Sequence, residues 1–257
     1  MQNEEFVSFN GLNDVYRRNI CESTKGRIRR AVVARDLAQI CAMLPESPRG
    51  ILDAGCGDGS TLRDLARMQD HVFALDVSSE AVDAARVNLA GLDAAVFQAD
   101  ILSLPSEILD RRYHLIICHA LLEWIRDKSM ALEILASLLE PDGVLSLLFY
   151  NRDALFFQTL IVGNFPYADS DLISRHRQKM TPPFPADRQS VTDLATRLGL
   201  EIVLESGVRV FHDYMRHKDR QIDMFEDVLR YELKLSRDPR FMHLGRYVHL
   251  ALKRSGR

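Results

Sequence analysis

The sequence lacks the features that mark several common protein classes. No apolar run approaches the roughly 18–20 residues that a helix needs to cross a bilayer. The 4 cysteines include no C-x-x-C pair, so their spacing indicates neither a zinc site nor a disulfide framework, and we expect no bound metal. The polar start, Met1 to Glu5, does not resemble a signal peptide. These absences predict a protein of the reducing cytoplasm that contacts no membrane.

The chain also lacks an excess of positive charge. Its formal net charge is −3 at pH 7, so contact with a polyanion must depend on local basic patches. Hydrophobic residues make up 47% of the chain and charged residues 27%, which indicates a globular protein rather than a disordered one. With 257 residues, the chain can form one large α/β domain or two small ones.

One stretch near residue 55 carries the strongest local signal. A short apolar run that ends at Leu52 predicts a strand, and Asp53 follows it, with glycines at 55, 57 and 59 and a helix-forming segment at 60–68. Glycine has no Cβ, so such a loop can turn sharply and approach a ligand closely. The helix start beyond it offers unpaired N–H groups to an anion. A purely structural turn would use the same glycines.

A second acidic residue lies about 20 residues further on, where nucleotide-binding folds place a ribose ligand. Val72 to Asp76 reads as a buried strand that ends in a carboxylate, which can accept hydrogen bonds from ribose hydroxyls. The spacing Gly-x-Gly-x-Gly lacks the later third glycine of the dinucleotide fingerprint. The pair of signals therefore favours a nucleoside cofactor other than NAD.

Strand and helix patterns alternate from 51 to 150, which predicts a parallel sheet. A helix capped by Ser23 or Thr24 precedes this region and is expected to run to about Leu44. We expect strands at 50–54, 72–76, 94–98, 113–118 and 143–149, helices at 6–20, 60–68, 78–90, 103–109 and 128–139, and a turn at 140–143.

The regular alternation of strand and helix patterns ends after Tyr150. A helix at 153–163 precedes an irregular, proline-containing segment at 164–188, which we expect to be a substrate-binding insertion. Beyond it we expect a helix at 190–198, a strand at 200–210, a helix at 217–236 and a strand at 246–252, with kinks at 207–209 and 245–247.

The run Asp53-Ala54-Gly55-Cys56-Gly57-Asp58-Gly59 resembles the first motif of the class I S-adenosylmethionine-dependent methyltransferases. This resemblance implies a Rossmann-like, doubly wound α/β fold with a seven-stranded, mostly parallel sheet, and S-adenosylmethionine as cofactor. It implies one domain, made of a helical cap at 1–48, a cofactor-binding core at 49–151, an insertion at 152–189 and the rest of the sheet at 190–257.

Further segments resemble the bacterial tRNA wobble-uridine carboxyl methyltransferases within this class. They are 19–20 and 24–26 with Arg29, 119–120 with 122–124, 143–147 with 149–151, 163–165, 207–214 and 244–247. The resemblance implies esterification of the carboxylate of 5-carboxymethoxyuridine, with the tRNA anticodon loop as partner. That family usually has Asp-Ala-Gly-Gly-Gly where this chain has Asp-Ala-Gly-Cys-Gly, and Cys56 is small enough for the loop to keep its form.

The same resemblance implies the residues that hold the cofactor. Arg29 would meet the methionine carboxylate, and Asp76 the ribose. The remaining contacts would be Gly55, Cys56 and Gly57 at the methionine, Asp100 and Ile101 at the adenine, and His119. Two of these residues have ordinary structural alternatives, since Asp100 can cap a helix and a lone histidine such as His119 is often a structural hydrogen-bonding group.

The part of the site that binds the methyl-accepting carboxylate requires cations rather than a general base. A carboxylate with a pKa of about 4 is already an anionic nucleophile at neutral pH, so no residue is expected to act as a general base. Burying that anion needs a cation or convergent donors. The candidates for positioning the substrate are Arg209, His212, Tyr214, Tyr150, Arg246 and Tyr247. Arg209 can fork a carboxylate, or it can form a structural salt bridge at a strand kink.

Basic residues gather in two segments that we expect to contact the anticodon loop. They are Arg175, Arg177, Lys179 and Arg188 in the first, and Arg216, Lys218 and Arg220 in the second. Two other functions remain open from sequence. The chain could methylate another carboxylate or RNA base, or it could bind RNA or the cofactor without catalysis.

Overall fold

The computed structural model describes residues 23–172 and 182–256. The helix expected at 6–20 and three of the basic candidates, Arg175, Arg177 and Lys179, lie outside these residues.

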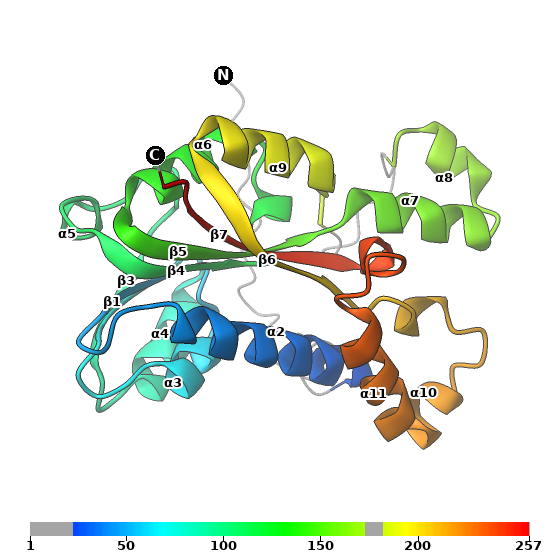
Figure 1. The fold of residues 1–257 in the computed structure, drawn as a ribbon, viewed down its shortest axis with the longest axis horizontal. Helices are drawn as coiled ribbons and strands as arrows, with labels where there is room; N and C mark the ends of the chain where they lie inside the picture. The colour runs from blue at the N-terminus through cyan, green and yellow to red at the C-terminus, as the bar shows by residue number, and fades with distance from the viewer. Residues whose placement is uncertain (1–22, 173–181, 257) are drawn as a thin grey trace.

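A seven-stranded sheet forms the centre of the described protein, with the strand order β3-β2-β1-β4-β5-β7-β6 (Figure 1). The strands are β1 (Gly50–Ala54), β2 (His71–Asp76), β3 (Asp93–Gln98), β4 (Tyr113–His119), β5 (Leu139–Tyr150), β6 (Leu200–Val208) and β7 (Tyr247–Arg254). The first five are parallel, and β7 runs antiparallel to both of its neighbours. The strand order reverses between β1 and β4, where open α/β sheets bind their ligands. The predicted fold class is confirmed.

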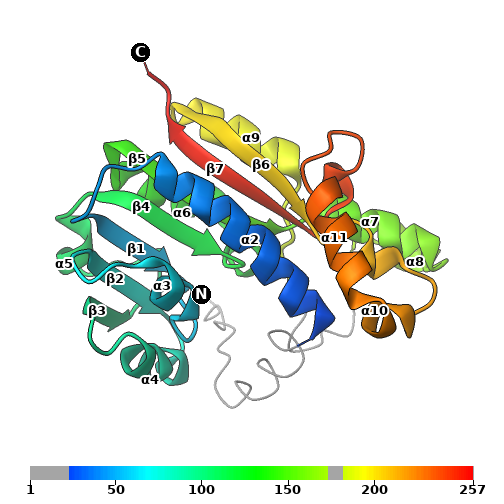
Figure 2. The same ribbon diagram turned by 60° about the horizontal axis from the view of Figure 1, so that its bottom comes forward.

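Helices cover both faces of this sheet. One face carries α2 (Thr24–Ala42), α3 (Ser60–Leu65), α4 (Ser79–Asn88) and α11 (Phe225–Leu235), and Figure 2 shows α2 lying across the strands beside α11. The other face carries α5 (Ser106–Leu109), α6 (Lys128–Ser137) and α9 (Arg188–Arg197). Beyond the end of the sheet lie α7 (Arg152–Ile161) and α8 (Phe165–Asp169). The remaining helical elements are α10 (Arg220–Asp223), η2 (Leu122–Trp124), η3 (His212–Tyr214) and η4 (Met242–Leu244).

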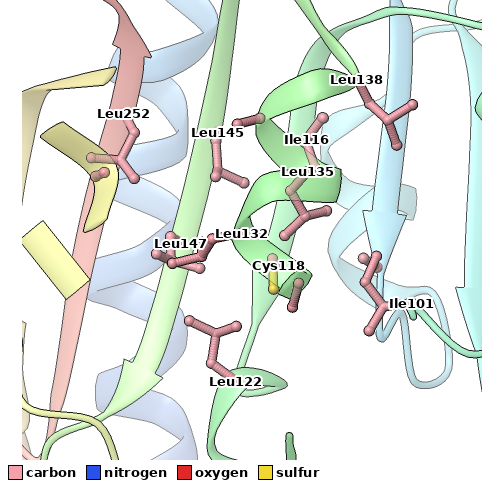
Figure 3. Packing of buried hydrophobic residues seen from close by; sticks show 14 of the residues in the cluster. Ile101, Ile116, Cys118, Leu122, Leu132, Leu135, Leu138, Leu145, Leu147 and Leu252 are labelled. Carbon is pink, nitrogen blue, oxygen red and sulfur yellow. The ribbon is translucent and has the colours of Figure 1, made fainter. Parts of the chain in front are cut away.

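The apolar core has two parts, one on each face of the sheet. On the α6 face, Leu132 and Leu135 pack over Leu145 and Leu147 of β5 (Figure 3). Burying a leucine side chain of this kind contributes about 1.5–3 kcal/mol. Cys118 lies within the same cluster, and burial raises the pKa of its thiol, so it is an inert core residue.

The helix before β1 begins where its sequence predicted. Ser23 is the N-cap of α2, and its side-chain oxygen accepts a hydrogen bond from the Gly26 N–H at 3.3 Å. Ile28, Val32, Leu37 and Ile40 form the buried stripe of this helix.

Two predicted elements of the core have different bounds. The helix expected at 103–109 is shorter, because the Asp100 carboxylate accepts from the Leu102 N–H at 2.9 Å and Ser103 closes a turn onto the Asp100 carbonyl. The turn expected at 140–143 lies within β5, where the pairing with β4 shifts register between Tyr113 and Leu115.

The C-terminal half also departs from the prediction in two places. The helix expected at 217–236 is divided into α10 and α11 at Met224, whose φ of −116° and ψ of 31° are not helical. The segment expected to be irregular contains α8, which starts after Asn164 with a proline in its first turn.

Both predicted kinks are close backbone contacts at glycine. A Cβ on Gly207 would lie 2.0 Å from the Met242 carbonyl oxygen, and one on Gly245 would lie 2.7 Å from the Gly207 Cα. The ends of β6 and β7 therefore meet η4 at a distance that only glycine permits.

We expect Gly207→Ala to lower the free energy of unfolding by more than about 2 kcal/mol, because a backbone carbonyl must move. Gly91→Ala is the control, since Gly91 has a φ of 90° but open space around its Cβ position, and it should cost only about 1 kcal/mol. Denaturant unfolding measures both values, and equal losses would contradict the steric explanation.

Candidate active site

The glycine loop after β1 is fastened to the end of β2. Gly55 and Cys56 both donate their backbone N–H groups to the Leu75 carbonyl, at 2.8 and 3.0 Å. The Gly57 N–H donates to Asp76 Oδ2 at 3.0 Å. Gly55 has a φ of 80°, a conformation that favours glycine. The structure thus brings together four of the predicted cofactor residues.

Asp76 is oriented by the backbone around it. Its Oδ1 accepts from the Ser78 N–H at 2.9 Å, while Oδ2 is bonded to the loop. Burial raises the pKa of Asp76, although these hydrogen bonds oppose that shift. A carboxylate held in this way keeps lone pairs that can accept further hydrogen bonds, such as those of two vicinal hydroxyls.

Asp53, at the end of β1, was not among the predicted site residues. It is only 3% exposed, and burial raises its pKa to about 8, with the nearby charges of Asp76 and Asp58 adding to the shift. Without a ligand Asp53 is therefore largely protonated at neutral pH. The only sequence signal for the raised pKa of Asp53 was its position directly before the glycine loop.

A cavity of about 360 Å³ lies between α2 and α3. Two of the predicted cofactor residues, Arg29 and His119, border it, together with Leu148 of β5. The other predicted cofactor residues do not. Asp100 lies in the turn after β3 and is not a helix cap, while the Ile101 side chain is 2% exposed in the core, so only its backbone can meet a ligand.

Two arginines share one carboxylate at the other side of the candidate site. Asp213 Oδ2 lies 3.0 Å from Arg209 Nη2 and 3.0 Å from Arg246 Nε. The Asp213 Oδ1 atom is 2.9 Å from His212 Nδ1. The positive charges of Arg209 and Arg246 and the His212 hydrogen bond outweigh burial and hold the pKa of Asp213 well below its usual range. Lys25 of α2 adds a further positive charge to the field at Asp213, and sequence reasoning had not assigned it to the site.

Tyrosines connect this arginine pair to Arg29. Arg246 Nη1 donates to the Tyr150 hydroxyl at 3.1 Å, and the Tyr150 and Tyr247 rings meet edge to face with centroids 5.3 Å apart. The Tyr247 ring centroid is 5.4 Å from the Arg209 guanidinium carbon and 5.9 Å from that of Arg29. One ring therefore lies between a candidate cofactor residue and the candidate acceptor residues.

His212 and Tyr214 hold Asp213 and the loop around it in place through contacts with other protein groups. His212 is fully buried, and its ring nitrogens contact Asp213 and the Thr24 hydroxyl, the latter at 3.0 Å. The Tyr214 hydroxyl bonds to the Leu244 carbonyl at 2.9 Å and to the Ala154 carbonyl at 3.3 Å. Both side chains are engaged with protein groups, so their contribution to the site is the position of Asp213 and of the loop around it.

A buried glutamate fixes the backbone beside Arg209. Arg209 has a φ of 60°, which is strained for a residue with a side chain and costs on the order of 1–3 kcal/mol. The Glu232 carboxylate accepts the next three backbone N–H groups, those of residues 210–212, at 2.7, 3.0 and 2.8 Å. Nothing local in the sequence indicated this role for Glu232. Arg209 Nε is buried and has no hydrogen-bond partner in the described structure.

The predicted RNA contacts are only partly available. Arg188 forms a two-bond ion pair with Glu205 of β6, so it is not a free cation as the sequence had suggested. Lys218 donates to the Asp213 carbonyl at 3.0 Å, and Arg216 and Arg220 are exposed near it.

Two broader features complete the description of residues 23–172 and 182–256. No group of three or more His, Cys, Asp or Glu side chains is placed to hold a metal ion there. No helix in this part of the chain combines the length and apolar character that crossing a membrane requires.

We expect the stability of the cofactor-free protein to depend on the ionisation of Asp53. Its pKa is about 8 in the fold and near 3.8 when unfolded, so unfolding releases a proton between these pH values. Ionisation of Asp53 therefore lowers the free energy of unfolding as pH rises between these two pKa values, by at most about 1.4 kcal/mol per pH unit.

Asp53→Asn removes this ionisable group. The free energy of unfolding of the variant, relative to that of the parent, should therefore rise from pH 5 to about pH 7.5. Denaturant unfolding at several pH values measures the trend. The exposed residue Asp83 provides the control, as Asp83→Asn should show no such growth. A constant difference between Asp53→Asn and the parent would contradict the raised pKa.

Comparison with known proteins identifies the fold and its relatives. Residues 51–143 match the family model described as "Methyltransferase domain". The chain is 32% identical over 250 residues to the tRNA 5-carboxymethoxyuridine methyltransferase of Escherichia coli K12, covering 96% of each chain.

Solved structures show the same fold. Magnesium protoporphyrin IX methyltransferase from Synechocystis PCC 6803, with bound SAH, aligns with a TM-score of 0.64 at 18% identity over 96% of each chain. An S-adenosylmethionine-dependent methyltransferase from Clostridium acetobutylicum aligns with a TM-score of 0.61 at 13% identity, over 96% of this chain and 99% of that one. By its sheet, its glycine loop and its full-length likeness to the Escherichia coli enzyme, this chain belongs to the S-adenosylmethionine-dependent class I methyltransferases.

Proposed function

We propose that this protein acts in the cytoplasm on tRNA, where it methylates the carboxylate of 5-carboxymethoxyuridine at the wobble position. The name of the Escherichia coli relative supports this substrate. The observation in this chain that carries the proposal is the buried, unpartnered Nε of Arg209. It belongs to an arginine pair that shares a single carboxylate, so the cluster has positive charge in excess and a donor to spare.

The candidate residues also fit the cofactor. We propose that Arg29 pairs with the methionine carboxylate, that Asp76 holds the ribose, and that Asp100 with the Ile101 backbone borders the adenine. Gly55, Cys56, Gly57 and His119 would complete the contact. The cavity at Arg29 and His119 and the fixed carboxylate of Asp76 support this assignment. When bound, S-adenosylmethionine supplies a methyl group already activated on a positively charged sulfur.

The protein then has to position an anion rather than remove a proton. The acceptor carboxylate is ionised at neutral pH, so one of its oxygens can accept the methyl group directly. We propose that Arg209, Arg246 and the Tyr150 hydroxyl bind the other oxygen and leave the first free, and their mutual contacts support this role. Alignment of this kind contributes roughly 7–11 kcal/mol in favourable systems. We propose that the packed rings of Tyr150 and Tyr247 help to exclude water there, which would strengthen these electrostatic contacts.

The charge balance of the cluster favours a carboxylate ligand over a neutral base. Arg209 and Arg246 carry two positive charges against one on Asp213, and Lys25 adds a third nearby. One further anion therefore compensates charge that the protein leaves uncompensated. A substrate without the carboxylate would leave the buried Nε of Arg209 unpaired.

We expect Arg209→Ala to raise the KM for tRNA about tenfold or more, while the affinity for S-adenosylmethionine stays within about twofold of the parent. Steady-state kinetics with tRNA bearing 5-carboxymethoxyuridine and calorimetry with the cofactor measure the two effects. Arg86→Ala, on the distant helix α4, is the control.

The same variant tests what Arg209 recognises. The parent should bind tRNA bearing the carboxylate more tightly than the same tRNA with 5-methoxyuridine, and Arg209→Ala should lose most of that preference. If Arg209→Ala kept the full preference, Arg209 would not be the carboxylate ligand.

We expect tRNA binding to weaken as salt rises, because phosphate contacts release counterions. Removal of Arg216 or Arg220 should each reduce the slope of log K against log[salt] by about 0.7–0.9, whereas Arg86→Ala should leave it unchanged. A flat salt response of the parent would contradict phosphate contacts by these residues.

The decisive test of the reaction is mass spectrometry of wobble nucleosides from cells that lack this protein. Loss of the methyl ester with accumulation of the free acid supports the proposal. An unchanged nucleoside pattern, with methylation of another RNA base or of a small acid in vitro, would assign the fold and cofactor to a different acceptor.

A further inference from the structure

A chain of hydrogen bonds crosses the middle of the sheet and ends at His119. Asp36 Oδ2 lies 2.9 Å from His249 Nδ1, His249 Nε2 lies 2.9 Å from Ser146 Oγ, and Ser146 Oγ lies 2.9 Å from His119 Nε2. Asp36, Ser146 and His249 are completely buried. We refer to these four residues, from α2, β5, β7 and β4, as the buried relay.

The first member of the relay can only accept hydrogens. Asp36 Oδ1 receives Arg35 Nε and Nη2 at 3.0 and 2.8 Å, and Arg237 Nη2 at 2.6 Å. The hydrogen bond from His249 and the charge of Arg35 hold the pKa of Asp36 well below its usual range against the effect of burial. An ionised Asp36 requires that His249 Nδ1 carries the hydrogen between them.

Charge balance then sets the state of His249. Arg35 and Arg237 already outweigh the single charge of Asp36, so a protonated His249 would be an uncompensated cation in a buried place. Its ring also lies edge to face with His119, with centroids 5.3 Å apart. A neutral His249 with its hydrogen on Nδ1 has a free lone pair on Nε2, which accepts the Ser146 hydroxyl hydrogen.

The last step of the relay fixes His119. Since Ser146 gives its hydrogen to His249, its oxygen must accept from His119 Nε2–H. Burial holds the pKa of His119 well below its usual range, and the charge of Arg29 adds to this shift, so the ring is neutral. Its Nδ1 then carries a lone pair. Within residues 23–172 and 182–256 this atom makes no hydrogen bond, and His119 borders the same cavity as Arg29.

We propose that Asp36, His249 and Ser146 are positioning residues that fix His119 in the tautomer with an unprotonated Nδ1, which accepts a hydrogen bond from the ammonium group of S-adenosylmethionine. An arginine beside a hydrogen-bond acceptor matches the carboxylate and ammonium groups of an amino acid. The inference rests on the proposed cofactor role of Arg29 and His119. It does not depend on the identity of the methyl acceptor.

The relay makes an unusual prediction for Asp36→Asn. The guanidinium hydrogens of Arg35 and Arg237 require an oxygen at the Oδ1 position, so the amide nitrogen of the new side chain must face His249. That nitrogen donates to His249 Nδ1, which moves the imidazole hydrogen to Nε2. Ser146 then donates to His119 Nε2, and His119 carries its hydrogen on Nδ1. The substitution therefore inverts a tautomer three hydrogen bonds away.

The tautomer is measured directly in the cofactor-free protein. Two-bond ¹⁵N–¹H correlation spectra distinguish the two neutral forms of histidine, and His119→Gln assigns the His119 signals. We expect the parent to show hydrogen on Nε2, Asp36→Asn to show it on Nδ1, and Asp36→Asn with Ser146→Ala to show no inversion. Ser206→Ala is the matched control, because Ser206 is a buried serine opposite His249 that bonds Arg35 and Arg237 but not the relay.

Cofactor affinity by calorimetry gives the second measurement. Asp36→Asn should raise the Kd for S-adenosylmethionine about tenfold, which corresponds to about 1.4 kcal/mol. Adding Ser146→Ala to Asp36→Asn should recover part of that loss, because it disconnects His119 from the wrong hydrogen pattern. Ser146→Ala alone should cost roughly twofold to fivefold, since it only releases the tautomer.

Damage to the fold alone would give the opposite pattern, in which the second substitution adds to the first. The proposal is overturned if the parent carries hydrogen on His119 Nδ1, or if the double variant binds the cofactor no better than Asp36→Asn. If Asp36→Asn does not fold, an unchanged His119 tautomer distribution or unchanged cofactor affinity in Ser146→Ala overturns it. Failure of tRNA methylation with the expected tautomers and affinities would reject the proposed substrate and leave the relay in place.

Discussion

The proposed acceptor side of the site depends on one buried carboxylate, that of Asp213. Without it, the guanidinium groups of Arg209 and Arg246 would be close, like-charged and buried, an arrangement that costs several kcal/mol. His212 holds Asp213 from behind, and Glu232 holds the backbone that carries it. The carboxylate of Asp213 thus holds two arginines together while neutralising only one of their charges. The remaining positive charge favours an anionic ligand.

The sequence predicted the parts of the site that arise from local patterns. The glycine loop, the acid at the end of β2 and the alternation of strands and helices are each visible within a few residues. The position of the site follows from them, because parallel strands present their carboxyl ends at one edge of a sheet. Arg209 and Arg246 were candidates because a buried substrate carboxylate needs cations, and the carboxylate of Asp213 that they share could not be inferred from either residue alone.

The rest could not be predicted because the partners are far apart in the chain. His249 bonds Asp36 across 213 positions, and Glu232 meets the 210–212 backbone only after α11 has folded back on the loop. Arg188 looked like a free cation until the fold brought Glu205 of the neighbouring strand beside it. The predicted start of the helix at 103–109 was wrong for a local reason. The side chain of Asp100 bonds the Leu102 backbone and turns the chain before α5.

Helix α2 carries both Arg29 and Asp36, seven residues apart. At 3.6 residues per turn this spacing is almost two full turns, so both side chains lie on the same face, separated by roughly 10.5 Å along the axis. The helix therefore works as a rigid spacer between the cavity at Arg29 and the start of the relay. An insertion or deletion between positions 29 and 36 would rotate one contact off that face, so this interval has a fixed length.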